Sequence, residues 1–86
     1  MSHKLVGFAD SINSVYIQNQ LQSIANQISG LEIEFGTEGD RRLAKYTKTP
    51  NRFPCLMLFQ NNVHKNHIHS KMTEDYALRW VRGAIG

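Results

Sequence analysis

The sequence predicts an α/β fold in which strands and helices follow one another in the order βαβ-α-ββ-α. An apolar run of five residues follows Pro54, a strand–helix–strand pattern occupies residues 4–35, and an amphipathic helix follows Thr73. The chain has 86 residues, of which 41% are apolar and 20% are charged. Because this composition supports one modest hydrophobic core, we expect a single domain spanning residues 1–86.

The first third of the chain reads as a strand, a helix and a second strand. Residues 4–9 are a short apolar run, and Asp10 and Ser11 after them are natural N-cap residues. Residues 31–35 alternate between apolar residues and glutamate, which predicts a strand with one covered face near a sheet edge. A strand, a crossover helix and a second strand imply a right-handed βαβ unit, so we expect the two strands to be parallel. The helix, over residues 13–29, has an apolar stripe of Val15, Ile17, Leu21, Ile24, Ala25 and Ile28.

The middle of the chain predicts a short helix and then a buried strand. The helix should begin at residue 38 or 40 and end at residue 46, because acidic residues lead it and basic residues follow. Pro54 can open the next strand because its missing N–H costs nothing before the hydrogen-bond ladder starts. Residues 55–59 are all apolar and do not alternate with polar residues, so we expect a central strand covered on both faces.

The last part of the chain reads as a hairpin followed by a helix. Asn61 and Asn62 suit a two-residue turn, because asparagine tolerates the left-handed conformation that such turns need. Residues 63–69 are polar and predict an exposed strand that pairs back on the apolar run. Thr73 is expected to cap the final helix, whose buried stripe comprises Ala77, Leu78, Val81 and Ile85.

The stretch LAKYTKTPNRFPCLMLFQ, residues 43–60, resembles the second half of the thioredoxin and glutaredoxin families, and the element order extends the resemblance to nearly the whole chain. The resemblance implies a four-stranded mixed sheet in the order 2-1-3-4. It places the first and third helices on one face and the short second helix on the other. It also implies that Pro54 is the cis-proline that precedes the third strand and lines the active site.

Redox members of these families carry C-x-x-C or C-x-x-S at the start of the first helix, where the helix N-terminus lowers the pKa of the leading thiol. The corresponding stretch here is S-I-N-S, residues 11–14, which puts Ser11 and Ser14 in the cysteine positions. A serine hydroxyl has a pKa far too high to exchange with a disulfide. We therefore expect a redox-inactive chain, not an enzyme and without a cofactor, in which both serines cap or cover the helix.

Cys55 is the only cysteine, which rules out an internal disulfide and favours a reducing compartment, the cytoplasm or a particle assembled there. A free cysteine in a central strand is usually a small buried apolar residue. The alternative is a thiol exposed beside Pro54, which would suit glutathione binding or a mixed disulfide with a partner.

A run of basic residues without an intervening acid is the clearest surface feature. It is the candidate partner-binding surface and comprises Arg41, Arg42, Lys45, Lys48 and Arg52. Such a run suits an acidic protein partner or a small anion. Weak nucleic-acid binding is a second alternative, although the sequence has no recognised nucleic-acid motif.

Three histidines lie in the predicted exposed strand. His67 and His69 are two residues apart and would share one face, while His64 would point to the other. An H-x-H pair can supply two zinc ligands, but a structural zinc site needs four. We therefore expect a solvated edge strand and no metal site.

These observations favour a non-catalytic binding or structural module that belongs to a larger cellular or viral assembly. The apolar runs are too short to span a membrane, so no membrane partner is expected. Tyr76 and Trp80, four residues apart, should pack at the rim of the core; if both were exposed, they would instead mark an interface.

Overall fold

The structure is a computed structural model, and it describes residues 3–37, 54–61, 63–68 and 72–85. Its elements, in chain order, are β1 (His3–Ala9), α1 (Ser14–Gln27), β2 (Glu32–Thr37), β3 (Cys55–Gln60), β4 (Val63–Ile68) and α2 (Glu74–Ile85). The four strands form one sheet in the order β2-β1-β3-β4, which confirms the predicted topology. The short helix predicted to end at residue 46 lies outside the described residues, as does the peptide bond that precedes Pro54.

Strand β1 pairs in parallel with β2 and antiparallel with β3, and β3 pairs antiparallel with β4. The parallel pair joined by α1 is the predicted βαβ unit, and the antiparallel β3–β4 pair is the predicted hairpin. Asn61 at the hairpin turn has a φ of 54°, the left-handed conformation expected of it. The two inner strands are therefore β1 and β3.

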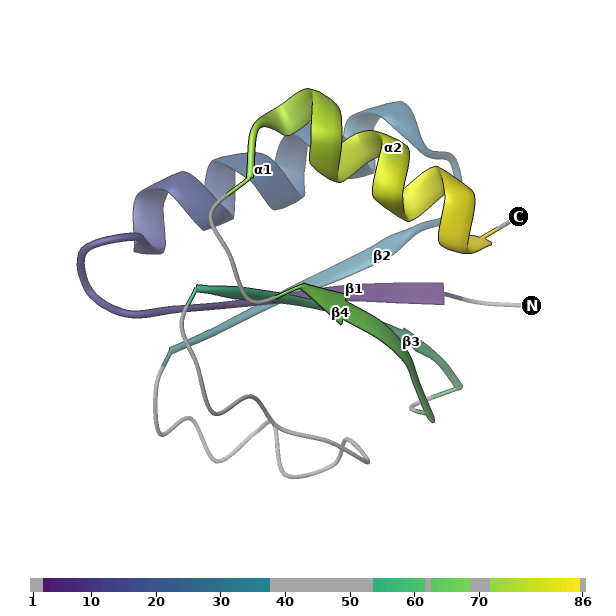
Figure 1. The fold of residues 1–86 in the computed structure, drawn as a ribbon, viewed down its shortest axis with the longest axis horizontal. Helices are drawn as coiled ribbons and strands as arrows, with labels where there is room; N and C mark the ends of the chain where they lie inside the picture. The colour runs from purple at the N-terminus through teal and green to yellow at the C-terminus, as the bar shows by residue number, and fades with distance from the viewer. Residues whose placement is uncertain (1–2, 38–53, 62, 69–71, 86) are drawn as a thin grey trace.

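Both described helices cover the same face of the sheet (Figure 1). Their apolar stripes pack on alternate residues of the inner strands. The resulting core contains Leu5, Ala9, Ile17, Leu21, Ile24, Leu56, Leu58, Met72, Ala77 and Val81. Burial of this apolar area is the main term that holds the helices to the sheet.

The other face of the sheet is also buried. Its cluster comprises Val6, Phe8, Cys55, Met57 and Phe59. All side chains of residues 55–59 are buried, whichever face they point to. The run that does not alternate is thus an inner strand covered on both sides, as predicted.

Strand β2 lies at one edge of the sheet and has one covered face. Ile33 and Phe35 are half-buried and pack against the helix-side core, while Glu32 is exposed. Lys4 Nζ on β1 lies 3.9 Å from a carboxylate oxygen of Glu32 and 3.8 Å from one of Glu34. The alternation of apolar residues and glutamate therefore has the structural meaning expected of it.

Helix α1 is shorter at both ends than its predicted range of 13–29. Its N-cap is Asn13, whose backbone N–H and side-chain amide both donate to Asp10 Oδ1 at 3.0 Å. Asp10 thus holds the turn before the helix and is not itself the N-cap. The helix ends at Gln27, and Gly30 reverses the chain with a left-handed φ of 81°.

Helix α2 begins as the sequence predicts. The N–H of Tyr76 donates to Thr73 Oγ1 at 3.2 Å, and Glu74 and Asp75 occupy the first turn. Trp80 packs against the core as predicted, whereas Tyr76 is exposed, so the prediction that Tyr76 packs at the rim was wrong. The two rings also do not form the exposed pair that would mark an interface. No helix in the described ranges is long and apolar enough to cross a membrane.

Strand β4 is polar and lies at the other edge, but its register contains a bulge that the sequence did not indicate. Phe59 pairs with His64, whereas Leu58 pairs with Asn66, so Lys65 is an extra residue in the ladder. The extra residue brings His64 and His67 to the same face. The prediction that they point to opposite faces was wrong, because it assumed an uninterrupted alternation.

Candidate functional site at the start of helix α1

The candidate site lies at the end of the sheet where β1 stops and β3 starts. Phe8 on β1 pairs with Cys55 on β3 in an antiparallel register. Continuing that register by one residue puts Pro54 opposite Ala9, directly before the turn that leads into α1. Pro54 and the turn of residues 10–13 therefore lie at the same end of the sheet, as the resemblance implied.

The two serines stand where the helix starts. Ser11 is exposed in the turn, and Ser14 is the first residue of α1 and half-buried. The Ser14 hydroxyl lies 3.5 Å from the carbonyl oxygen of Ser11, to which it can donate. The Ser14 hydroxyl takes part in local hydrogen bonding, and neither serine can supply the thiolate that disulfide exchange requires.

Two apolar side chains beside these serines are exposed. Ile12 in the turn is 88% exposed, and Val15 in the first turn of α1 is 69% exposed. Val15 was assigned to the buried stripe, and that assignment was wrong. The stripe follows Ile17, Leu21 and Ile24, which are spaced by three or four residues, whereas Val15 is only two residues before Ile17 and points elsewhere.

The exposure of Ile12 was not anticipated either. Its position in the sequence could have indicated it. Ile12 stands between a serine and an asparagine in the turn before the helix, so it does not belong to the apolar stripe of α1. Together with Ser11, Ile12 and Val15 form a small surface at this end of the molecule, which we call the α1 entry surface. Its apolar part is the kind of side chain that contributes to protein contacts.

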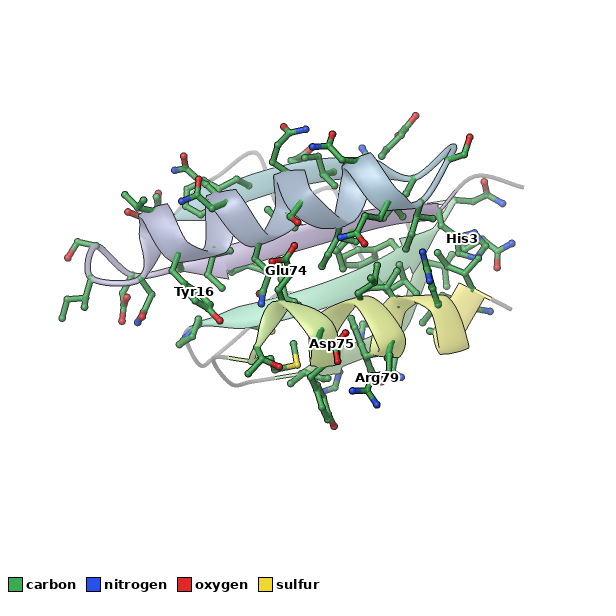
Figure 2. All side chains as sticks on the ribbon, turned by 90° about the horizontal axis from the view of Figure 1, so that it is seen from above. His3, Tyr16, Glu74, Asp75 and Arg79 are labelled. Atoms are coloured by element: carbon green, nitrogen blue, oxygen red, sulfur yellow. The ribbon has the colours of Figure 1, made fainter. Side chains whose placement is uncertain are left out.

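The α1 entry surface is held in place by a contact between α1 and the segment before α2. Tyr16 Oη and Gln20 Nε2 both donate to the carbonyl oxygen of Met72, the latter at 2.9 Å. Tyr16 projects from α1 toward the side on which α2 begins (Figure 2). Gln20 and Met72 are buried, so these bonds fix the first half of α1 relative to α2 in an environment with little competition from water.

Cys55 does not reach the surface at this site. Its relative exposure is 0%, and it lies in the cluster with Val6, Phe8, Met57 and Phe59. The structure therefore agrees with a small buried residue in an inner strand. The alternative, a thiol exposed beside Pro54, does not fit this burial.

The basic run lies outside the described residues. None of Arg41, Arg42, Lys45, Lys48 and Arg52 can be placed relative to the α1 entry surface, and their role in partner binding stays a prediction. Within the described part of the chain, no group of three or more His, Cys, Asp or Glu side chains is gathered so that it could hold a metal ion.

Comparison with known proteins supports the fold. No protein-family model matches the sequence, and no curated protein matches it significantly. The periplasmic thioredoxin SoxS from Paracoccus pantotrophus, in its reduced form, matches 99% of this chain and 100% of its own, with a TM-score of 0.65 at 12% identity. The J-Trx1 fragment of ERdj5 also has a TM-score of 0.65, at 17% identity, and this chain spans 44% of that fragment. The chain thus has a thioredoxin-like fold.

Proposed function

We propose that this chain is a thioredoxin-like module without dithiol chemistry, and that it binds a protein partner through the α1 entry surface. The observation that carries the proposal is the exposure of Ile12 and Val15 at the start of α1, where the redox members of the resembling families carry their cysteines. Neighbouring exposed apolar side chains favour a protein contact, because a partner that covers them removes apolar surface from water.

The serines support the non-catalytic half of the proposal. Ser11 and Ser14 occupy the two ends of the S-I-N-S stretch at the beginning of α1, and the one thiol of the chain, on Cys55, is fully buried. Disulfide exchange needs a thiolate that its substrate can reach. Neither the serines at the start of α1 nor the buried Cys55 on β3 offers one.

The hydrogen bonds that fix the start of α1 support the proposed binding of a partner. Asp10 holds the turn through two hydrogen bonds to Asn13, and Tyr16 and Gln20 anchor the first half of the helix to Met72. A partner that covers Ile12 and Val15 therefore meets a preorganised surface and pays little for ordering it.

The first experiment tests the absence of redox activity. The purified chain is assayed for reduction of insulin disulfides beside its Cys55→Ser variant. We expect both proteins to stay at the background rate. If the parent reduces insulin above background and the Cys55→Ser variant does so too, the chain is an enzyme and the proposal is refuted. If only the parent is active, the chemistry belongs to Cys55.

The second experiment tests the binding surface. The double variant Ile12→Ser/Val15→Ser is compared with the parent chain in capture of partners from the native source. We expect the double variant to lose the captured protein and to keep its thermal stability. Val63→Ser is the matched control, because Val63 is also exposed but lies on β4. Equal loss in the control, or undiminished capture by the double variant, contradicts the proposal.

A further inference from the structure

The bulge in β4 creates a close pair of histidines on the face of the sheet opposite the helices. His64 pairs with Phe59 and His67 pairs with Met57, and both of these β3 residues belong to the buried cluster on that face. Opposed residues of an antiparallel pair share a face, so the two imidazoles also do. His64 Nε2 lies 2.9 Å from His67 Nδ1, and the ring centroids are 5.0 Å apart.

The surroundings of the pair keep its two rings close together. Both histidines are half-buried, and the His64 ring meets the buried Phe59 ring edge-on, with centroids 6.0 Å apart and an interplanar angle of 72°. The backbone N–H of His67 donates to Asn66 Oδ1 at 2.8 Å. The two nitrogens are thus held close by the ladder and the bulge.

We propose that His64 and His67 form a two-histidine chelate for a divalent transition-metal ion that prefers right-angle coordination, such as Ni²⁺ or Cu²⁺. Two nitrogens at about 2.0–2.1 Å from an ion lie about 2.9 Å apart when they subtend a right angle and about 3.3 Å apart at the tetrahedral angle. The observed separation matches the right angle. Imidazole is also a preferred ligand of Ni²⁺ and Cu²⁺, and Cu²⁺ is expected to bind most tightly.

The proton balance of binding follows from the existing contact. A hydrogen bond between two imidazoles needs one N–H and one lone pair, so one ring is neutral at its contacting nitrogen. The ion takes the lone pairs of His64 Nε2 and His67 Nδ1, and both rings turn so that these lone pairs meet at the ion. The proton that lay between them moves to the remaining nitrogen of its own ring, or to solvent if that ring was charged.

The rest of the coordination sphere comes from outside the pair. No three His, Cys, Asp or Glu side chains converge within the described residues. The pair itself supplies two ligands, and its affinity depends on both rings together. Removing either one leaves a single imidazole and should reduce affinity about a hundredfold, because the second ligand is no longer delivered at high effective concentration.

The test uses the full untagged chain and NiCl₂ at pH 7.5, followed by isothermal titration calorimetry. We expect one Ni²⁺ per chain, and loss of that binding in His64→Ala and in His67→Ala. His3→Ala and His69→Ala are the controls, and the latter separates this pair from the H-x-H pair that the sequence suggested. Affinity that survives His64→Ala but falls in His69→Ala overturns the assignment, as does the absence of saturable binding below about 1 mM.

A second measurement needs no substitution and so does not depend on how the variants fold. Cu²⁺ is added in small amounts while the histidine ring signals are followed by NMR. Paramagnetic broadening should affect the rings of His64 and His67 first, and a drop in pH to 5 should remove it, because protons compete for the same lone pairs. Broadening that begins at His3 or His69 overturns the proposal.

Discussion

Ile17 on α1 lies directly over Gly7 on β1, and the space between them admits no side chain. A Cβ atom added to Gly7 would lie 2.6 Å from Ile17 Cγ2 and 2.7 Å from Leu21 Cδ1. Both neighbours are buried, so neither can swing into solvent to make room. The absence of a side chain at Gly7 is therefore what lets α1 pack closely on the inner strand.

The first prediction is that Gly7→Ala destabilises the fold by about 1–3 kcal/mol, the usual cost of overpacking a filled core. The measurement is urea denaturation followed by circular dichroism. Gly83→Ala is the matched control. Gly83 lies on α2 with nothing within 4 Å of its added Cβ, so this change should stabilise the helix by about 0.5–1 kcal/mol. A Gly7→Ala variant as stable as the parent would show that α1 does not sit this close to β1.

The second prediction concerns the carbonyl oxygen of Met72, which accepts from both Tyr16 and Gln20. Tyr16→Phe alone should cost about 0.5–1.5 kcal/mol, since Gln20 still satisfies the carbonyl. Gln20→Leu alone should be no worse, because it also removes Gln20 Oε1, a buried oxygen to which no described residue donates a hydrogen bond. The double variant should cost more than the sum, because a buried carbonyl loses both donors.

A double-mutant cycle by urea denaturation measures this coupling. Gln22→Leu replaces Gln20→Leu in a control cycle, because Gln22 is an exposed residue of the same helix that bonds only Asn26 in the described structure. We expect no coupling between Tyr16 and Gln22. Strict additivity of Tyr16→Phe and Gln20→Leu would mean that the two donors do not share one acceptor.

The third prediction separates the two residues that the sequence offered as caps for α1. Asp10→Ala should destabilise the chain by about 0.5–2 kcal/mol, because the carboxylate holds both Asn13 donors. Ser11→Ala should change stability little, because Ser11 is exposed and only its backbone carbonyl takes part in the contact with Ser14. The melting temperatures of the two variants are compared. A larger loss of stability in Ser11→Ala than in Asp10→Ala would place the cap on Ser11.

Much of the fold could be predicted because its signals are local and mutually consistent. Residues 55–59 are apolar without alternation, and only an inner strand gives such a run two covered faces. Thr73 and Asn61 likewise identify a helix start and a turn by their own side chains. The strand order needed the family resemblance, since periodicity does not say which strands are neighbours.

The histidine pair and the α1 entry surface were harder to predict. They depend on the register of β4 and on the direction in which single side chains point. One extra residue at Lys65 reverses the alternation of β4, and nothing in a polar strand reveals it. Without the bulge, His64 and His67 would point to opposite faces of the sheet, and their ring nitrogens could not lie 2.9 Å apart. Val15 is a different case. Its separation of two residues from Ile17 is not a same-face helical spacing, so the sequence itself indicates that its side chain points away from the stripe.

The last prediction concerns the basic run, which lies outside the described residues. The segment before it carries four acids, Glu32, Glu34, Glu38 and Asp40, whereas the run itself carries only positive charge. An acidic partner would relieve the self-repulsion of these cations and would associate faster. Reversal of Arg41, Arg42 and Lys45 together to Glu should therefore weaken capture of the native partner and leave the melting temperature nearly unchanged.

Three changes are needed because an exposed charge pair contributes only about 0.2–1 kcal/mol, so a single reversal would be hard to measure. The control also reverses three charges, at Lys65, Arg79 and Arg82, which are exposed and lie outside the run. Because Arg79 pairs with Asp75, the melting temperature of this control is measured too. Capture is measured at low salt and again at high salt, where screening should reduce the difference between the parent and the triple variant. Equal capture by both proteins at low salt would mean that the run is a solvated surface and that the partner contacts the α1 entry surface alone.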